Sequence, residues 1–312
     1  MKLLQLPLLA AGLLAASMAS ALININTILV GDAGNANDTT GFGDVSDSYH
    51  IGTYEVTNSQ YTAFLNATAA TDTHSLYNTA MSSSTHGGIT RAGSPGSYTY
   101  SVKTGFSDKP VNYVSFWDAA RFSNWLTTGN TETGVYVLDA TGISNNTIMR
   151  DATAWANGGV AVASENEWYK AAYYDGSGGY YDYPMQSNAV PTAGNPPGGA
   201  NSANFSGGPG TFTDVGAYTG SASHYGTFDQ GGNAFEWNDT VISTSNRGLR
   251  GGSFNDADIT LLSSYRISRD PTFELNTLGF RVSSLAPIPE PSATTAMLAG
   301  LGLLIALRGR RT

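Results

Sequence analysis

The chain has 312 residues, a formal net charge of −9 and only 12% charged residues. An acidic chain of this kind is a poor partner for nucleic acid and for anionic membrane surfaces. It has no cysteine, which excludes disulfides, thiolate metal sites and cysteine nucleophiles. Four histidines are scattered along the chain without an H-x-H or H-x-x-x-H pair, so no local zinc motif is present. They are His50, His74, His86 and His224.

The first residues have the three parts of a secretory signal. Met1-Lys2 supplies a positive charge, Leu3 to Ala16 is apolar, and Ala19-Ser20-Ala21 is an A-x-A cleavage motif. We therefore expect residues 1–21 to be a cleaved signal peptide and the protein to be exported.

The first predicted elements are a strand and a helix. Alternating apolar and polar residues over 45–56 predict the strand. Thr57 or Asn58 can cap a helix that continues to about Asn66. Residues 67–107 are rich in Ser, Thr and Gly, and we expect them to form a long surface insertion with short strands.

A second helix is predicted near residue 120. Residues 110–115 form a short extended piece, and Ser115 caps a helix over 116–126 whose apolar residues recur at helical spacing. Residues 127–159 are rich in turn formers, with a predicted strand over 134–138.

A third helix begins at a capping box. Ser164 and Glu167 have the spacing at which each side chain caps the other's backbone, which predicts a helix to Tyr173. Beyond Asp175 glycine and proline favour coil as far as Gly210. Short extended segments are expected after that, at 214–218, 234–237, 249–254, 264–268 and 279–282. A few helices among many short strands indicate one irregular α+β domain.

The C-terminal segment, residues 287–312, forms a second targeting signal. Pro289-Glu-Pro291 precedes an apolar run over 293–307 and a tail with three arginines. The run is shorter than the ~20 residues of a full membrane span. This order closely resembles the PEP-CTERM sorting signal of Gram-negative bacteria, which implies a short transmembrane helix and an exosortase-type processing enzyme as a partner. A plain C-terminal membrane anchor is the alternative.

Six blocks in the body of the chain occur in a fixed order. They are Glu55-Val-Thr-Asn58, Pro110 to Ala120 with Asn124-Trp-Leu126, Ser164 to Trp168, Gly232 to Trp237, Arg250 to Phe254 and Gly279-Phe-Arg281. Together they resemble the formylglycine-generating enzyme, or sulfatase-modifying factor, domain family. The resemblance spans about 51–284 within an expected domain at 22–286. It implies an irregular C-type-lectin-like α+β fold with little regular secondary structure.

The resemblance also implies calcium. In the family the Gly-Asn-x-x-Glu-Trp loop binds this ion, which maps to Gly232, Ala234 and Glu236 here. Oxygen ligands from a loop suit calcium. The alternative is that Glu236 pairs with an arginine such as Arg250. A second family calcium site maps to Asn204 and Phe205, but no carboxylate follows before Asp214.

The chemistry of the family is not expected in this chain. The family enzymes use two cysteines that bind copper, and the matching positions here are Asp256 and Leu261. Copper(I) prefers thiolates, so we expect no copper. His50 and His224 could contribute to a histidine cluster, although separate structural roles are favoured. The rival hypothesis is an enzyme of unknown carboxylate- or metal-dependent chemistry that uses Asp256 with Asp258, Asp270 and Glu274.

We therefore expect a non-catalytic binding or structural module, exported to the envelope surface or extracellular matrix of a Gram-negative bacterium. Its expected partner is a polysaccharide or a surface protein, and its membrane contact is the sorting helix before cleavage. A tyrosine group could stack on sugars or, alternatively, pack inside its own loops. Its members are Tyr173, Tyr174, Tyr180, Tyr181 and Tyr183.

Overall fold

A computed structural model describes residues 23–288. The helices are α1 Asn58–Thr68, α2 Ala80–Ser83, α3 Phe116–Thr128, α4 Ala140–Asn145, α5 Ala152–Ala156 and α6 Glu165–Tyr173, with a 3-10 turn η1 at Asp258–Leu261. The strands are β1 Thr27–Val30, β2 Tyr49–Gly52, β3 Ile89–Ala92, β4 Thr99–Val102, β5 Ala161–Val162, β6 Thr192–Ala193, β7 Ser202–Ala203, β8 Phe235–Ser243, β9 Asn246–Arg250, β10 Ile267–Arg269, β11 Leu278–Phe280 and β12 Val282–Ser284. The predicted signal peptide at 1–21 and the Pro-Glu-Pro motif and apolar run of the predicted sorting signal lie outside this range. Within it, no helix combines the length and apolar character that crossing a membrane requires.

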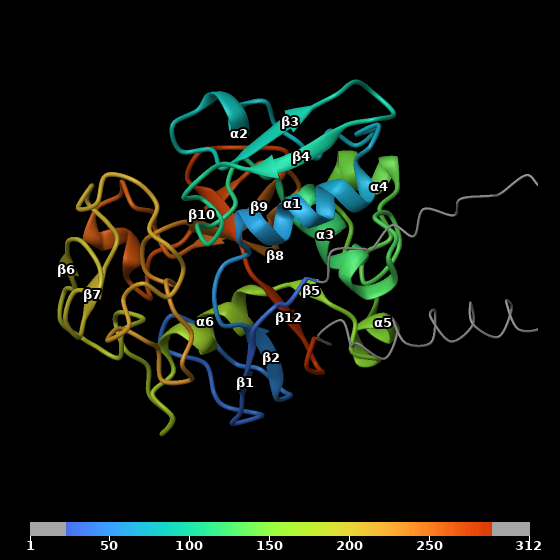
Figure 1. The fold of residues 1–312 in the computed structure, drawn as a ribbon. Coiled ribbons are helices and arrows are strands. Elements are labelled where there is room, and N and C mark those ends of the chain that lie inside the picture. The colour runs from blue at the N-terminus through green and yellow to red at the C-terminus, as the bar shows by residue number, and fades with distance from the viewer. Residues whose placement is uncertain (1–22, 289–312) are drawn as a thin grey trace, which may run out of the picture.

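Two four-stranded sheets organise the domain (Figure 1). One has the order β1-β2-β12-β5 and the other β10-β9-β8-β11. Strand β11 runs parallel to β8, and β12 pairs antiparallel with β2 and β5. Arg281 is the single residue between β11 and β12, so it stands where the chain passes from one sheet to the other.

The helix starts follow from local capping chemistry. Of the two predicted caps for α1, Thr57 caps the helix and forms a capping box with Gln60. Ser115 and Asp118 form the same arrangement at α3, and Ser164 forms it with Glu167 at α6. Helix α3 continues to Thr128, two residues beyond the prediction, because Gly129 adopts the left-handed conformation that ends a helix.

Two predicted strands are shorter than the sequence suggested. The strand predicted over 45–56 is limited to β2, and 134–138 makes only an isolated bridge between Thr133 and Val137. The glycine-rich region after Asp175 is mostly coil, as predicted, apart from the two-residue strands β6 and β7. Residues 45–56 alternate as a strand does, but outside β2 they are assigned to no strand.

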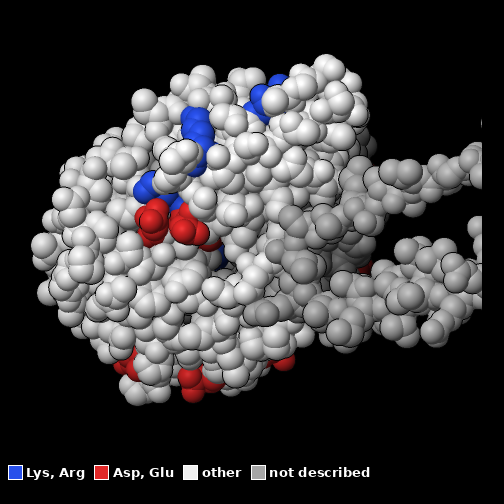
Figure 2. Space-filling model, in the orientation of Figure 1, with Lys and Arg blue, Asp and Glu red and all other residues white. Residues whose placement is uncertain are grey.

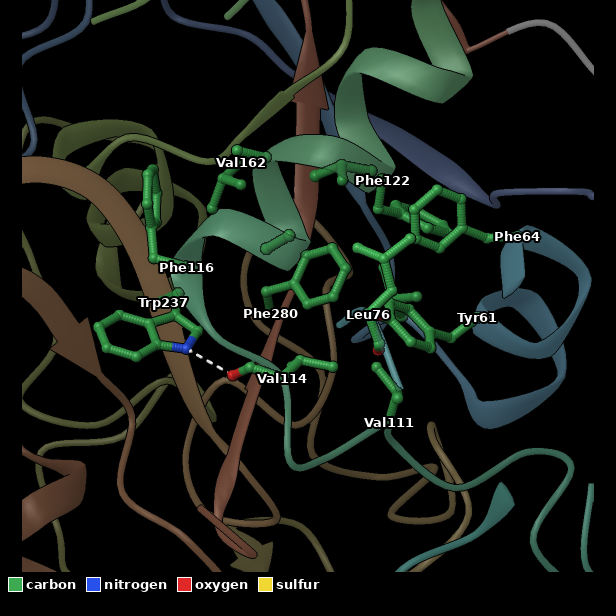
Figure 3. Close-up of a cluster of buried hydrophobic side chains, with 14 of the residues drawn as sticks. Tyr61, Phe64, Leu76, Val111, Val114, Phe116, Phe122, Val162, Trp237 and Phe280 are labelled. Atoms are coloured by element: carbon green, nitrogen blue, oxygen red, sulfur yellow. Dashed lines mark hydrogen bonds between the residues drawn. The ribbon is translucent and has the colours of Figure 1, made fainter. Parts of the chain in front are cut away.

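The main core is aromatic and lies between α1, α3 and the two sheets (Figure 3). The Phe122 ring meets Phe64 of α1 and Phe280 of β11, each with ring centres 5.4 Å apart and near-perpendicular planes. Trp237 of β8 is fully buried and donates from Nε1 to the Val114 carbonyl at 3.0 Å. Edge-to-face pairs of this kind add to the stabilisation from burial.

The surface carries few charges. Figure 2 shows one face on which most atoms belong to uncharged residues and blue and red patches are small. Several arginines are instead inside the protein: Arg247, Arg250 and Arg281 are fully buried. A buried guanidinium needs a carboxylate or carbonyl partner, so these residues define the polar centre of the domain.

Candidate functional site

Glu236 and Arg281 form the buried centre of the domain. Arg281 Nε donates to Glu236 Oε2 and Nη2 donates to Oε1, both at 2.6 Å, and both side chains are completely buried. Trp168 Nε1 donates to Glu236 Oε2 at 2.8 Å. Arg281 also donates to the carbonyls of Gly52 and Phe228 at 3.0 and 2.9 Å. This bidentate ion pair, with its further hydrogen bonds, therefore connects the junction between the two sheets to β2 and to helix α6.

The arginine partner of Glu236 is thus Arg281, whereas the sequence suggested Arg250 as an example. Arg250 donates from Nε to Glu165 Oε1 at 2.8 Å and from Nη1 to the Ser263 and Tyr265 carbonyls at 2.7 Å. Arg266 donates to both oxygens of Glu165 at 2.7 Å. Arg250 and Arg281 therefore each form a buried ion pair with a carboxylate from a distant part of the chain.

Two further carboxylates lie near the Glu236–Arg281 pair. Glu55 is buried, 4.0 Å from Arg281, and its Oε1 accepts from Asn233 Nδ2 at 3.1 Å. Its Oε2 has no hydrogen-bond partner within residues 23–288. Burial raises the pKa of Glu55 well above its ordinary value, and the charges of Asp229 and Glu236 raise it further. Burial also raises the pKa of Asp229 to about 6. One guanidinium thus faces three carboxyl groups. If all three were ionised, the group would have a net negative charge.

The loop predicted to hold calcium is adjacent to this centre. Gly232 has a φ of 89°, and a Cβ placed on it would lie 2.3 Å from the Asn204 carbonyl oxygen. Among the described residues, no donor is hydrogen bonded to the carbonyl oxygens of Gly232 or Ala234. Glu236 Oε1 accepts only from Arg281 and keeps a free lone pair. Gly232, Ala234 and Glu236 therefore present the oxygen ligands that calcium prefers.

The second predicted calcium set is incomplete. Asn204 donates to Asn233 Oδ1 at 3.0 Å, and its own Oδ1 is buried without a partner in the described part of the chain. The Phe205 carbonyl already accepts from Gly208. Asp214, the next acid along the chain, pairs with Lys109 at 3.3 Å, and its side chain is 60% exposed. The residues at Asn204 and Phe205 therefore lack the carboxylate that would complete a second site.

The two positions that match the family cysteines have different surroundings. Asp256 is half-buried and accepts from the Ser253 hydroxyl and, at 3.1 Å, from the Ser253 amide. Leu261 ends η1 and is completely buried. It packs against Tyr183, Met185, Ala203 and Phe205. One position is thus a turn-stabilising carboxylate and the other a core residue.

The other candidate catalytic groups have separate partners. Asp270 accepts from Thr272, Glu274 accepts from Asn78, and Asp258 begins η1. The four histidines also have separate surroundings: His74 meets Glu132 at 3.4 Å, His86 meets Thr211 at 3.2 Å, His224 packs on Tyr225, and His50 lies on β2. Across residues 23–288, no three His, Asp or Glu side chains are grouped to hold a metal.

The tyrosine group is largely internal. Tyr173, Tyr174 and Tyr183 are buried, and Tyr173 donates to the Leu261 carbonyl at 3.1 Å. Tyr180 and Tyr181 are half-buried. Packing within the loops, the alternative left open by the sequence, therefore accounts for three of the five. No pattern in the sequence separates the three buried tyrosines from the two half-buried ones.

A family model for the sulfatase-modifying factor enzyme 1-like domain matches residues 30–285. The chain belongs to this family. Its α+β fold, with little regular secondary structure, is the one that the sequence resemblance implied. The sulfatase-modifying factor domain is also similar in fold to a crystal structure of CarF, with a TM-score of 0.55 and 21% identity over 84% of this chain and 99% of that one.

The Treponema denticola variable protein 1 has the same fold, with a TM-score of 0.53 and 19% identity over 85% of this chain and 98% of that one. At these identities the similarities concern the fold alone. The comparison with curated proteins finds no match. These similarities therefore establish a fold and no activity.

Proposed function

We propose that the protein is an exported, non-catalytic binding or structural module of the cell surface or extracellular matrix. The observation that carries the proposal is the state of the two family cysteine positions, a Ser253-bound Asp256 and a core-packed Leu261. The chain has no other cysteine to replace them. Without thiolates, the family's copper chemistry has no ligands.

A structural calcium ion forms part of this proposal. Gly232, Ala234 and Glu236 would hold it, and it would offset the excess of carboxyl groups around Arg281. The unpartnered carbonyl oxygens of Gly232 and Ala234 support this assignment. The ion would stabilise the loop that connects Asn204 to β8, with no part in a reaction.

Export is supported by the signal peptide at 1–21 and the sorting signal at 287–312. Fractionation followed by mass spectrometry tests it. The surface-localised protein should lack residues 1–21 and be cut near Pro289-Glu-Pro291 in a host that has an exosortase. An intact Arg311-Thr312 end in surface protein would favour a plain membrane anchor.

The non-catalytic part is tested by a survey of matrix polysaccharides as substrates, with metals supplied and with metals removed. We expect no turnover. Turnover that disappears in Asp256→Ala would refute the proposal and establish the carboxylate-dependent enzyme instead. Asp47→Ala is a suitable control, because Asp47 is exposed and accepts only from its neighbour Ser46.

A further inference from the structure

A polar cavity of about 470 Å³ lies where three loops meet. The loops are the β1–β2 connection, the segment after α6 and the segment after η1. Its volume is within the ~300–1,000 Å³ of typical small-molecule sites. The lining residues are Asn37 to Thr40, Gly178 to Tyr180, Asp182, Ser263 and Ser264. Neither Asp256 nor Leu261 lines it, so the cavity is distinct from the lost thiol positions.

The cavity walls are fixed in place by hydrogen bonds between the loops. The Tyr169 hydroxyl bonds to Asp38 and, at 2.9 Å, to Thr40 Oγ1. The Asp182 carbonyl accepts from the Ser263 amide at 2.9 Å. The Tyr180 hydroxyl donates to the Ala36 carbonyl at 2.8 Å. A site that is already held in shape loses little conformational freedom when a ligand binds.

Several polar groups of the lining remain available to a ligand. Asp182 and Ser264 are exposed, and their side chains make no hydrogen bond within the described residues. Gly178 has no side chain to cover its peptide groups, whereas the N–H and the carbonyl of Gly179 are both already bonded to Asp175. Nothing lies within 4 Å of a Cβ placed on Gly178, which leaves open space there. The cavity thus offers a carboxylate, a hydroxyl and exposed backbone near one another.

The side chains that line the cavity indicate which class of ligand it would bind. Apart from the half-buried Tyr180 ring, the lining has hydroxyl, amide and carboxylate side chains and glycines, with no aliphatic side chain. It contains Asp38 and Asp182 but no lysine or arginine, so an anionic ligand would be repelled. Asp38 is already committed to Thr39, Thr40 and Tyr169, which leaves a single free carboxylate and too few ligands for a cation.

We propose that this cavity binds a neutral saccharide unit. Asp182 would accept hydrogen bonds from sugar hydroxyls, Ser264 and the Gly178 peptide would bond to others, and the Tyr180 ring would cover an apolar sugar edge. The proposal rests on the proposed function, because it names the site and the ligand class of that binding module. It also predicts discrimination, since uronic acids and sulfated sugars would face two carboxylates.

Isothermal titration calorimetry tests the site with the full-length protein. The probes are neutral hexasaccharides of glucose, mannose and galactose, with oligogalacturonate as the acidic comparison. We expect saturable binding of at least one neutral probe and none of the acidic one. Ser264→Trp, which fills the cavity, and Asp182→Ala, which removes the free acceptor, should each weaken binding at least tenfold.

The control variants are Ser48→Trp and Asp47→Ala, exposed residues of the same type outside the cavity, which should leave binding within twofold of the unmodified protein. Circular dichroism should show that all four variants remain folded. No binding of any neutral probe, or binding that survives both cavity variants, would overturn the site. If the protein still binds isolated matrix polymer in that case, the proposed function stands. Hydrolysis of a probe would instead refute the non-catalytic function.

Discussion

Replacing Arg281 with methionine should strongly destabilise the domain. The change keeps a long apolar stem but removes the guanidinium that makes two 2.6 Å bonds to Glu236 and faces Glu55 at 4.0 Å. Removing one partner of a buried ion pair costs about 3–5 kcal/mol, because the other charge stays buried without compensation. That is a large part of the ~5–15 kcal/mol that stabilises a typical domain.

The matched control is Arg266→Met. Arg266 also donates to a buried carboxylate, Glu165, but its side chain is 32% exposed and Arg250 remains to pair with that carboxylate. A partly exposed pair contributes only about 0–1 kcal/mol. The two substitutions are therefore alike in chemistry and differ in burial and in the presence of a second arginine.

The assay is urea unfolding at pH 7.5, followed by tryptophan fluorescence and circular dichroism together. Arg281→Met should lower the free energy of unfolding by about 2–5 kcal/mol more than Arg266→Met. Adding Glu236→Gln to Arg281→Met should recover part of the loss, since the unpaired buried charge is removed. A loss below about 1 kcal/mol, the range of exposed pairs, would refute the role given to this pair.

Three further predictions concern calcium, pH and catalysis. Chelation should lower the melting temperature and added calcium should restore it, by ~2.7 kcal/mol at a hundredfold excess over the dissociation constant. Glu236→Ala should abolish this response and Asp47→Ala should keep it; a melting curve indifferent to chelator contradicts the calcium site. Because the folded pKa of Asp229 is raised from 3.8 to about 6, the folded state holds the proton more tightly, so stability falls as pH rises through this interval. In calcium-free buffer, Asp229→Asn should therefore gain stability over the unmodified protein at pH 7.5 and lose that advantage near pH 4; an equal effect at both values argues against the shift. Mass spectrometry should detect no formylglycine in a sulfatase-type cysteine peptide, with or without copper, and any conversion would contradict the argument from Asp256 and Leu261.

Local features of the domain could be read from the sequence. Ser115 as a cap, and Ser164 with Glu167 as a capping box, predict their helix starts because a capping group bonds to backbone within four residues of it. The six ordered blocks predict the family, and the absence of cysteine excludes thiolate chemistry without any coordinates. Each of these conclusions depends on residue type and on short spacing along the chain.

The polar centre was decided only by the tertiary structure. Glu236 and Arg250 are register partners on β8 and β9, yet Arg250 bonds to Glu165 of α6 and Glu236 bonds to Arg281, 45 residues away. The sequence could not separate buried from half-buried tyrosines, nor place Asp182 and Ser264 at one cavity. The sequence alone determined the family, the helix caps and the missing thiols, because these need only local chemistry. Charge partners and cavities depend on which distant segments pack together, and only the folded chain establishes that.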